Sequence, residues 1–153
     1  MNWRNAVWWI LYSMLAIALQ SLLPGLDFLL PGFLVSVQER QPVQTACVGI
    51  WFVLLQEGMG NLAFGGVVLT FIVTIIFFYS GCTLFQGRNF LFVSLIGILL
   101  SAFRYVLFTL LCRLQEFPVN ADVLLDECLF QAFFTPFVWW GASSLRYVVK
   151  NES

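Results

Sequence analysis

The sequence predicts an all-α protein: a single integral membrane domain, a polytopic bundle of about six transmembrane helices with both termini cytoplasmic. Composition is the first reason, since 61% of the 153 residues are hydrophobic, only 10% are charged, and the mean hydropathy is +0.91. Soluble domains are about 45–50% apolar and about 25% charged. A chain this small could not bury so much apolar surface in water, so lipid is the solvent that suits it. The other two reasons are the length of the apolar runs and the distribution of basic residues between them.

Four apolar runs are long enough to be spanning helices, which need about 20 mostly apolar residues. They cover residues 5–23, 62–85, 90–114 and 123–149. The first run follows Arg4 and resembles a secretory signal, but its apolar character continues to Leu23 without the polar region that normally surrounds a cleavage site. We therefore expect this segment to be retained as the first span.

The segment between the first and the fourth span is less regular, because a polar cluster from Gln38 to Pro42 divides it. We expect two short helices, at residues 26–37 and 42–57, with Pro42 in a first turn, where its missing N–H is tolerated. The two helices could be true spans met by local thinning of the bilayer, or a re-entrant pair buried among other helices. A four-span topology, with this pair of short helices buried, also has an even number of spans and so leaves both termini on the same side. Both alternatives therefore stay open.

The basic residues predict the orientation of the bundle. With six spans, the outer connections hold only Arg113, whereas the inner ones hold Arg4, Arg40, Arg88, Arg146 and Lys150. Cytoplasmic connections are enriched in Lys and Arg, so the bias favours cytoplasmic termini. Aromatic residues near the inner ends are expected at the membrane interface, namely Trp3, Trp8, Trp9 and Tyr147. Trp139 and Trp140 lie deeper in their span and are expected to pack within the bundle.

Several classes of function lack the residues that they need. The chain has no histidine, which is the commonest general base and metal ligand, so we expect no enzyme activity, no cofactor and no bound metal. The net charge of −1 without a basic patch argues against nucleic acid as a partner. The four cysteines stand singly and are interpreted as small buried hydrophobic residues, although Cys112 and Cys128 fall near the same outer surface, where an oxidising compartment could permit a disulfide.

An arginine inside a predicted span is the strongest candidate for a special role, because a charge there is costly without a partner. Arg104 lies in the middle of the fifth span, and Glu57 ends the third span before a glycine-rich turn. We expect Arg104 to pair with Glu57, Gln56, Gln131 or a helix-end carbonyl, and Arg104→Leu to lower the folded yield. The intramembrane candidates for structural or partner-binding roles are Gln56, Glu57, Gly58, Gly60, Arg104 and Gln131.

Small residues in the fourth and fifth spans predict close contact between helices. Gly97 and Ser101 stand four residues apart in the fifth span, and Gly65 and Gly66 open the fourth. Such spacing lets two helix backbones approach closely in a membrane. The pattern does not say whether the neighbouring helix belongs to this chain or to another protein.

The chain resembles the MreD family of rod shape-determining proteins. The resemblance covers most of the chain and rests on six short spans in about 150 residues, and on a third span that ends in an acidic residue and a glycine-rich turn. Family members often carry an acidic residue with a glycine eight positions later, which matches Glu57 and Gly65 here. This chain departs from the pattern, because glutamate replaces the usual aspartate and Gly58 and Gly60 shift the small residues.

The resemblance implies a non-enzymatic scaffold of the bacterial inner membrane. Such a subunit would belong to the cell-elongation machinery, bind a bitopic MreC-like protein, and help couple cytoskeletal filaments to peptidoglycan synthesis. The family is also similar in fold to the substrate-binding subunits of energy-coupling-factor vitamin transporters. That similarity implies an alternative function, the binding of a small vitamin-like molecule in an externally open pocket lined by Glu57, Arg104 and nearby aromatic residues.

Overall fold

The protein was studied as a computed structural model that describes residues 3–23, 25–58, 65–83, 89–114 and 120–151. These residues form helices without any strand, which confirms the all-helical part of the prediction. The helices are α1 (Trp3–Leu22), α2 (Leu29–Gln38), α3 (Pro42–Gly58), α4 (Gly66–Gly81), α5 (Phe90–Leu114) and α6 (Ala121–Asn151). Each helix corresponds to one apolar run of the sequence. The largest difference between predicted and observed bounds is at α4, which was expected at residues 62–85.

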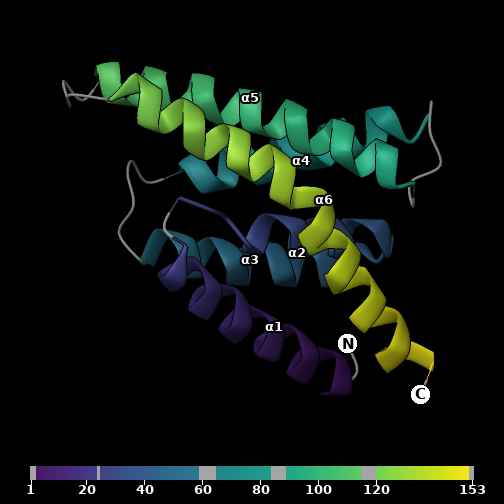
Figure 1. Cartoon of the computed structure of the whole chain (residues 1–153). Helices are drawn as coiled ribbons and strands as arrows, with labels where there is room; N and C mark the ends of the chain where they lie inside the picture. Colours follow the sequence, from purple (N-terminus) through teal and green to yellow (C-terminus); the bar gives the residue numbers. More distant parts are fainter. Residues whose placement is uncertain (1–2, 24, 59–64, 84–88, 115–119, 152–153) are drawn as a thin grey trace.

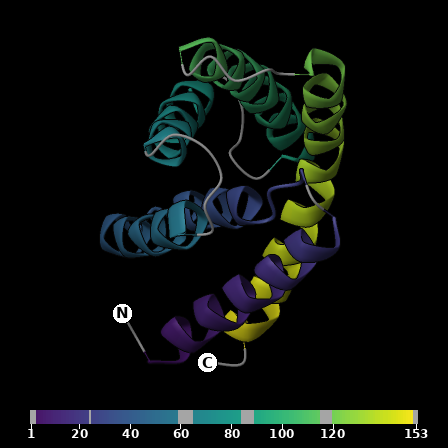
Figure 2. The same ribbon diagram turned by 90° about the vertical axis from the view of Figure 1, so that its left-hand side faces the viewer.

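The helices are arranged in three layers (Figures 1 and 2). α2 and α3 form the middle layer, with α1 on one side and α4 and α5 on the other. α6 joins the layers, because it packs along α5 and also against α2. The two marked chain ends lie at the same end of the bundle, on the right of Figure 1. We call this the terminal end, and the other the distal end.

The core is built around α2, the shortest helix. Every residue from Leu29 to Val37 is buried, and ten residues of α-helix extend only about 15 Å. Gly32 permits the close approach of α1, since a Cβ at this position would lie 2.2 Å from Tyr12 Cε1. The Tyr12 hydroxyl donates a hydrogen bond to the Phe28 carbonyl at 2.7 Å, which fixes α2 against α1. The short helix is therefore covered by protein on all faces.

α6 bends near its middle, so that its first half follows α5 and its second half runs to the terminal end (Figure 1). Pro136 lies inside this helix, and a proline removes one backbone hydrogen bond and kinks a helix. A Cβ at Gly97 would lie 3.2 Å from Thr135 Cβ and 3.5 Å from the Ala132 carbonyl oxygen. The close helix contact expected at Gly97 is thus confirmed, and its partner is α6 of the same chain.

Two of the tryptophan expectations need correction. Trp9 is only 3% exposed and forms an edge-to-face contact with Trp8, at 4.7 Å between ring centroids, so it packs in the core and does not lie at an interface. Trp139 is buried as expected, and its Nε1 donates to Gln38 Oε1 at 2.8 Å. Trp140 is 63% exposed, because the next residue along a helix points about 100° away from its neighbour.

By length and composition, two helices could cross a membrane, α1 and α5; α2 and α4 are shorter apolar helices. The outer surface of the bundle carries many exposed large apolar side chains. On α6 alone these include Leu129, Phe130, Phe133, Phe137 and Trp140.

Candidate functional site

A cavity of about 560 Å³ lies toward the distal end of the bundle, and every one of the six helices contributes to its wall. The wall residues come from the end of α1, the start of α2, the end of α3, the start of α4, the second half of α5 and the start of α6. Such a volume is in the range of pockets for small molecules, about 300–1,000 Å³. The wall combines apolar side chains with a few polar and charged ones, which is the usual composition of a ligand pocket.

Arg104 contributes the positive charge of this wall. Its guanidinium carbon lies 5.3 Å from the centre of the Phe108 ring, one turn further along α5. The side chain is half-buried, and within the described residues it has neither a hydrogen bond nor an ion pair. Ser101, one turn earlier, is 5% exposed, and its hydroxyl has no hydrogen-bond partner there. α5 therefore presents a free guanidinium and a free hydroxyl to the same cavity.

Gln131 and Asp27 close another part of the wall. The Asp27 backbone N–H donates to Gln131 Oε1 at 2.6 Å, and Gln131 Nε2 donates back to the Asp27 carbonyl at 2.9 Å. Asp27 Oδ1 also accepts from the backbone N–H groups of Leu29 and Leu30, at 2.9 and 3.1 Å, and so caps the first turn of α2. Gln131, a candidate from the sequence, thus fixes the start of α2 to α6 and lies in the same cavity wall as Arg104.

Two further polar groups in the wall have unused hydrogen-bonding capacity. Gln20 Nε2 donates to Asp27 Oδ1 at 3.2 Å, but the buried Gln20 Oε1 has no partner among the described residues. The Glu127 side chain lies against Gly25 and forms no ion pair in the part of the chain that the structure describes. The cavity therefore holds one cationic and two anionic side chains, Arg104, Asp27 and Glu127, which do not neutralise one another directly.

Within the described residues, Arg104 pairs with none of the partners expected for it, neither Glu57, Gln56 and Gln131 nor a helix-end carbonyl. Glu57 Oε1 instead accepts a hydrogen bond from the Gly65 backbone N–H at 2.8 Å, and so connects the end of α3 with the start of α4. Gly65 has φ +99°, which favours glycine. Gln56 lines the cavity and Gly58 ends α3, while Gly60 lies outside the described residues. The acidic residue and the glycine of the family-like spacing are thus in direct contact, whereas Arg104 faces the cavity.

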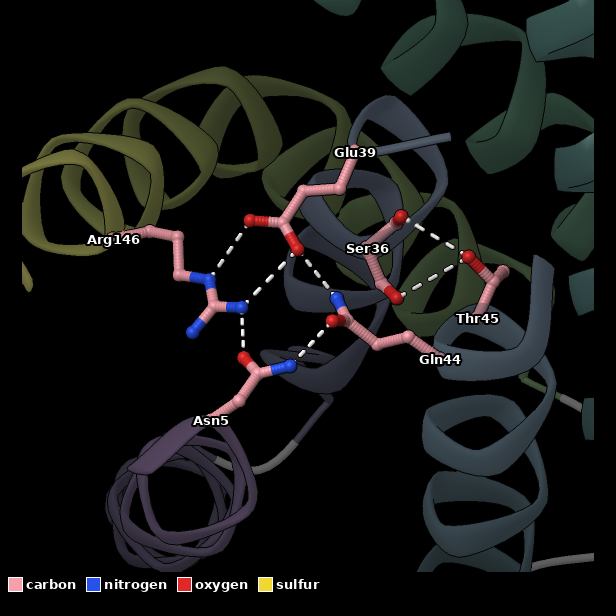
Figure 3. A network of polar contacts seen from close by, with 6 residues as sticks. All are labelled: Asn5, Ser36, Glu39, Gln44, Thr45 and Arg146. Atoms are coloured by element: carbon pink, nitrogen blue, oxygen red, sulfur yellow. Dashed lines mark hydrogen bonds and ion pairs between the residues drawn. The ribbon is translucent and has the colours of Figure 1, made fainter. Parts of the chain in front are cut away.

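A second polar cluster, at the terminal end, was not predicted (Figure 3). Arg146 Nε lies 2.9 Å from Glu39 Oε1, and both side chains are only 6% exposed. Arg146 also donates to Asn5 Oδ1, Asn5 donates to Gln44 Oε1 at 2.5 Å, and Gln44 donates to Glu39 Oε2. The ring of contacts joins α1, α3, α6 and the residue that follows α2. We call Asn5, Glu39, Gln44 and Arg146 the terminal cluster.

The terminal cluster corrects the interpretation of Arg146 as a residue of an inner connection. Its guanidinium carbon lies 4.8 Å from the Trp8 ring centre and 5.3 Å from that of Trp9, which places the charge between aromatic rings inside the bundle. Without Arg146, the basic residues assigned to inner connections fall from five to four, against one in the outer connections. Charge counting could not detect the buried pair, because Glu39 and Arg146 are 107 positions apart.

The cysteines form no disulfide in the structure, and all four are free thiols. Cys112 and Cys128 are buried, as expected for small hydrophobic residues, but Cys47 is exposed. The bridge considered between Cys112 and Cys128 is therefore not present.

Comparison with known proteins found no match: no family, no curated protein and no solved structure is significantly similar to the chain.

Proposed function

We propose that the protein is a multi-pass protein of the bacterial inner membrane, with all six helices within the bilayer region and both termini cytoplasmic. The distribution of polarity supports this. Large apolar side chains are exposed on the outer surface, such as Leu11 on α1 at 60% and Phe133 on α6 at 63%. The ion pair of Arg146 with Glu39 lies inside, at 6% exposure for both side chains. Exposed apolar surface of this extent marks contact with lipid or protein.

The half-length helix α2 fits this placement. Ten residues extend about 15 Å, about half of a hydrocarbon core of roughly 30 Å, so α2 could not cross alone. Irregular or short elements are tolerated at membrane depth where protein covers them, and α2 is covered throughout. Two alternatives were open for residues 26–57, two true spans or a re-entrant pair buried among other helices. The short length of α2 favours burial of this helix, and the orientation of the other helices is the same under both alternatives.

Membrane extraction and reporter fusions test this placement. The chain should stay in the membrane fraction after an alkaline carbonate wash. A cytoplasm-active reporter should work when fused after residue 151 or inserted between α2 and α3, and a periplasm-active reporter when inserted between α5 and α6. Release by carbonate, or a periplasmic C-terminal fusion, would refute the proposal.

We further propose that the protein is a non-enzymatic scaffold subunit of the cell-elongation machinery that binds a bitopic MreC-like protein. The observation that carries this is the contact of Glu57 with the Gly65 backbone, because these two residues match the acidic residue and glycine of the resemblance. The contact gives the spacing of eight residues a physical reason: the carboxylate fixes the turn in which Gly65 takes its left-handed conformation.

Co-purification tests the scaffold function. After mild detergent extraction from its host, the tagged protein should retain a bitopic shape-determining protein, and depletion should make rod-shaped cells round. Glu57→Ala should weaken the association, whereas Gly58→Ala, at a position where a Cβ would meet no atom of the described residues within 4 Å, should not. Normal cell shape after depletion, with no bitopic partner retained, would exclude this function.

A second function, the binding of a small molecule as the membrane subunit of a transporter, is favoured by the distal cavity of about 560 Å³. A purely structural bundle would gain from filling this space, whereas the wall instead carries uncompensated polar groups at Arg104, Ser101 and Gln20. The two functions differ in a simple measurement: mass spectrometry of the purified protein should find a retained small molecule only under the second.

A further inference from the structure

We propose that the distal cavity binds a zwitterion with an apolar body, its oxyanion on Arg104 and its ammonium group on Glu127 and Asp27. The inference deepens the small-molecule binding function and rests on it. Two sources have this chemistry, a free amino-acid-like compound and the headgroup of an aminophospholipid, and the experiment below separates them.

The first step concerns the positive charge. A guanidinium inside a membrane bundle is expected to pair with an anion, yet within the described residues Arg104 has only the Phe108 ring, at 5.3 Å. Among the described residues, no group accepts a hydrogen bond from the Arg104 N–H groups. The N–H groups of a guanidinium match two oxygens of a carboxylate or phosphate in a bidentate arrangement. The Ser101 hydroxyl, buried and without a partner, lies one turn away to donate a further hydrogen bond.

The second step concerns the negative charges. Asp27 and Glu127 give the wall two carboxylates against one guanidinium, a formal sum of −1 for these three side chains. A simple anion would leave both carboxylates uncompensated, and a simple cation would leave Arg104 uncompensated. A zwitterion compensates charges of both signs in one ligand. Asp27 Oδ1 is already used by the α2 backbone, so Glu127 is the principal partner for an ammonium group.

The third step concerns the rest of the ligand. The same wall includes Phe71 at 4% exposure and Leu100 at 1% exposure, so an apolar body would be enclosed by core residues. The buried Gln20 Oε1, which has no partner among the described residues, can accept one more hydrogen bond from the ligand. A ligand of this kind would satisfy Arg104, the Ser101 hydroxyl and Gln20 Oε1 at once, and these are groups of the cavity wall that the described residues leave without a hydrogen-bond partner.

Three related probes test the charge pattern on the purified full-length protein in detergent. L-Phenylalanine carries both charges, 3-phenylpropanoate carries only the anion, and 2-phenylethylamine carries only the cation. Thermal unfolding and tryptophan fluorescence should show binding of L-phenylalanine at millimolar concentration, at least tenfold tighter than either single-charge probe. Arg104→Gln and Glu127→Gln should each weaken it about 10-fold to 100-fold, since each removes a charged hydrogen-bonding partner.

Controls keep loss of folding apart from loss of binding. Arg113→Gln changes an exposed arginine on the same helix and should leave binding unchanged. Glu127→Gln changes a half-buried carboxylate that forms no hydrogen bond among the described residues, so its unliganded unfolding midpoint should match that of the unmodified protein.

The lipid arm uses native mass spectrometry from nanodiscs of phosphatidylethanolamine mixed equally with phosphatidylglycerol. Preferential retention of phosphatidylethanolamine that is lost in Glu127→Gln assigns the site to a headgroup. Binding of L-phenylalanine without such retention assigns it to a free compound. Equal or tighter binding of 3-phenylpropanoate or 2-phenylethylamine overturns the zwitterion and keeps the binding function. If neither the three small probes nor the lipids bind, both the zwitterion proposal and the small-molecule binding function are overturned.

Discussion

The two arginines inside the bundle, Arg146 and Arg104, have opposite surroundings. Arg146 is 5% exposed and its donors meet Glu39 and Asn5, so the terminal cluster is closed and its charges are compensated. Arg104 is half-buried beside a cavity, and within the described residues its donors meet no acceptor. The comparison teaches that a charge surrounded by partners is part of the packing, whereas a charge whose partners are missing is a candidate for a binding role.

The largest effect is expected at the terminal cluster. Glu39→Ala leaves the Arg146 charge buried and unpaired, which should lower the free energy of unfolding by about 3–5 kcal/mol. Denaturant titration in mild detergent measures this change, with Asp126→Ala, an exposed acid on α6, as the control. The double variant Glu39→Leu with Arg146→Leu should recover most of the loss, because it removes both charges together. A Glu39→Ala protein as stable as the control would mean that the cluster has no structural role.

At the cavity the corresponding substitution should have the opposite sign. Arg104→Leu removes a charge without a protein partner and should raise the free energy of unfolding of the unliganded protein by up to about 3 kcal/mol. This reverses the sequence-based expectation of a lower folded yield, which assumed a partner in Glu57, Gln56, Gln131 or a helix-end carbonyl. The same titration applied to Arg146→Leu should show destabilisation. If Arg104→Leu and Arg146→Leu lower the free energy of unfolding equally, the proposed difference between the cavity and the terminal cluster is incorrect.

The α5–α6 contact beside the cavity should respond to added volume. Gly97→Val places a branched side chain 3.2 Å or closer to Thr135 and should lower the free energy of unfolding by about 1–3 kcal/mol. Gly141→Val is the matched control on α6, because a Cβ at Gly141 would meet no atom within 4 Å. If both valine variants unfold at the same denaturant concentration, the close approach at Gly97 is incorrect.

The smallest effect is expected at the contact between Glu57 and Gly65, which connects the end of α3 with the start of α4. Glu57→Ala removes the acceptor of the Gly65 N–H and should lower the free energy of unfolding by about 0.5–1.5 kcal/mol. Hydrogen exchange of the Gly65 amide should become faster, while the amides of α2 keep their protection. An unchanged rate at Gly65 would contradict the contact.

The positions of the helices could be predicted from the sequence because apolar runs, prolines and polar interruptions act locally. Pro42 begins α3, as expected for a residue without a backbone N–H, and the polar cluster that ends in Pro42 separates α2 from α3. Local patterns also identified Gln56, Arg104 and Gln131, all of which lie in the cavity wall. A costly charge in a long apolar run is visible without any knowledge of the fold.

The partners of these residues could not be predicted. Glu39 lies in a polar stretch that looked like an ordinary connection, and Arg146 lies near the C-terminal end of a long helix, where lysine and arginine are common. Their contact joins segments 107 residues apart, so only the packing of the helices reveals it. The pairing of Arg104 with Glu57 was wrong because the Glu57 carboxylate instead accepts a hydrogen bond from the Gly65 N–H.

The burial of α2 also affects how the protein is made. A ten-residue helix is shorter than the roughly 20 residues of a spanning helix, and α2 packs against α6, which follows it far along the chain. The innermost helix therefore lacks one of its covering neighbours until α6 has been synthesised. Truncation before residue 121 would leave it without that neighbour.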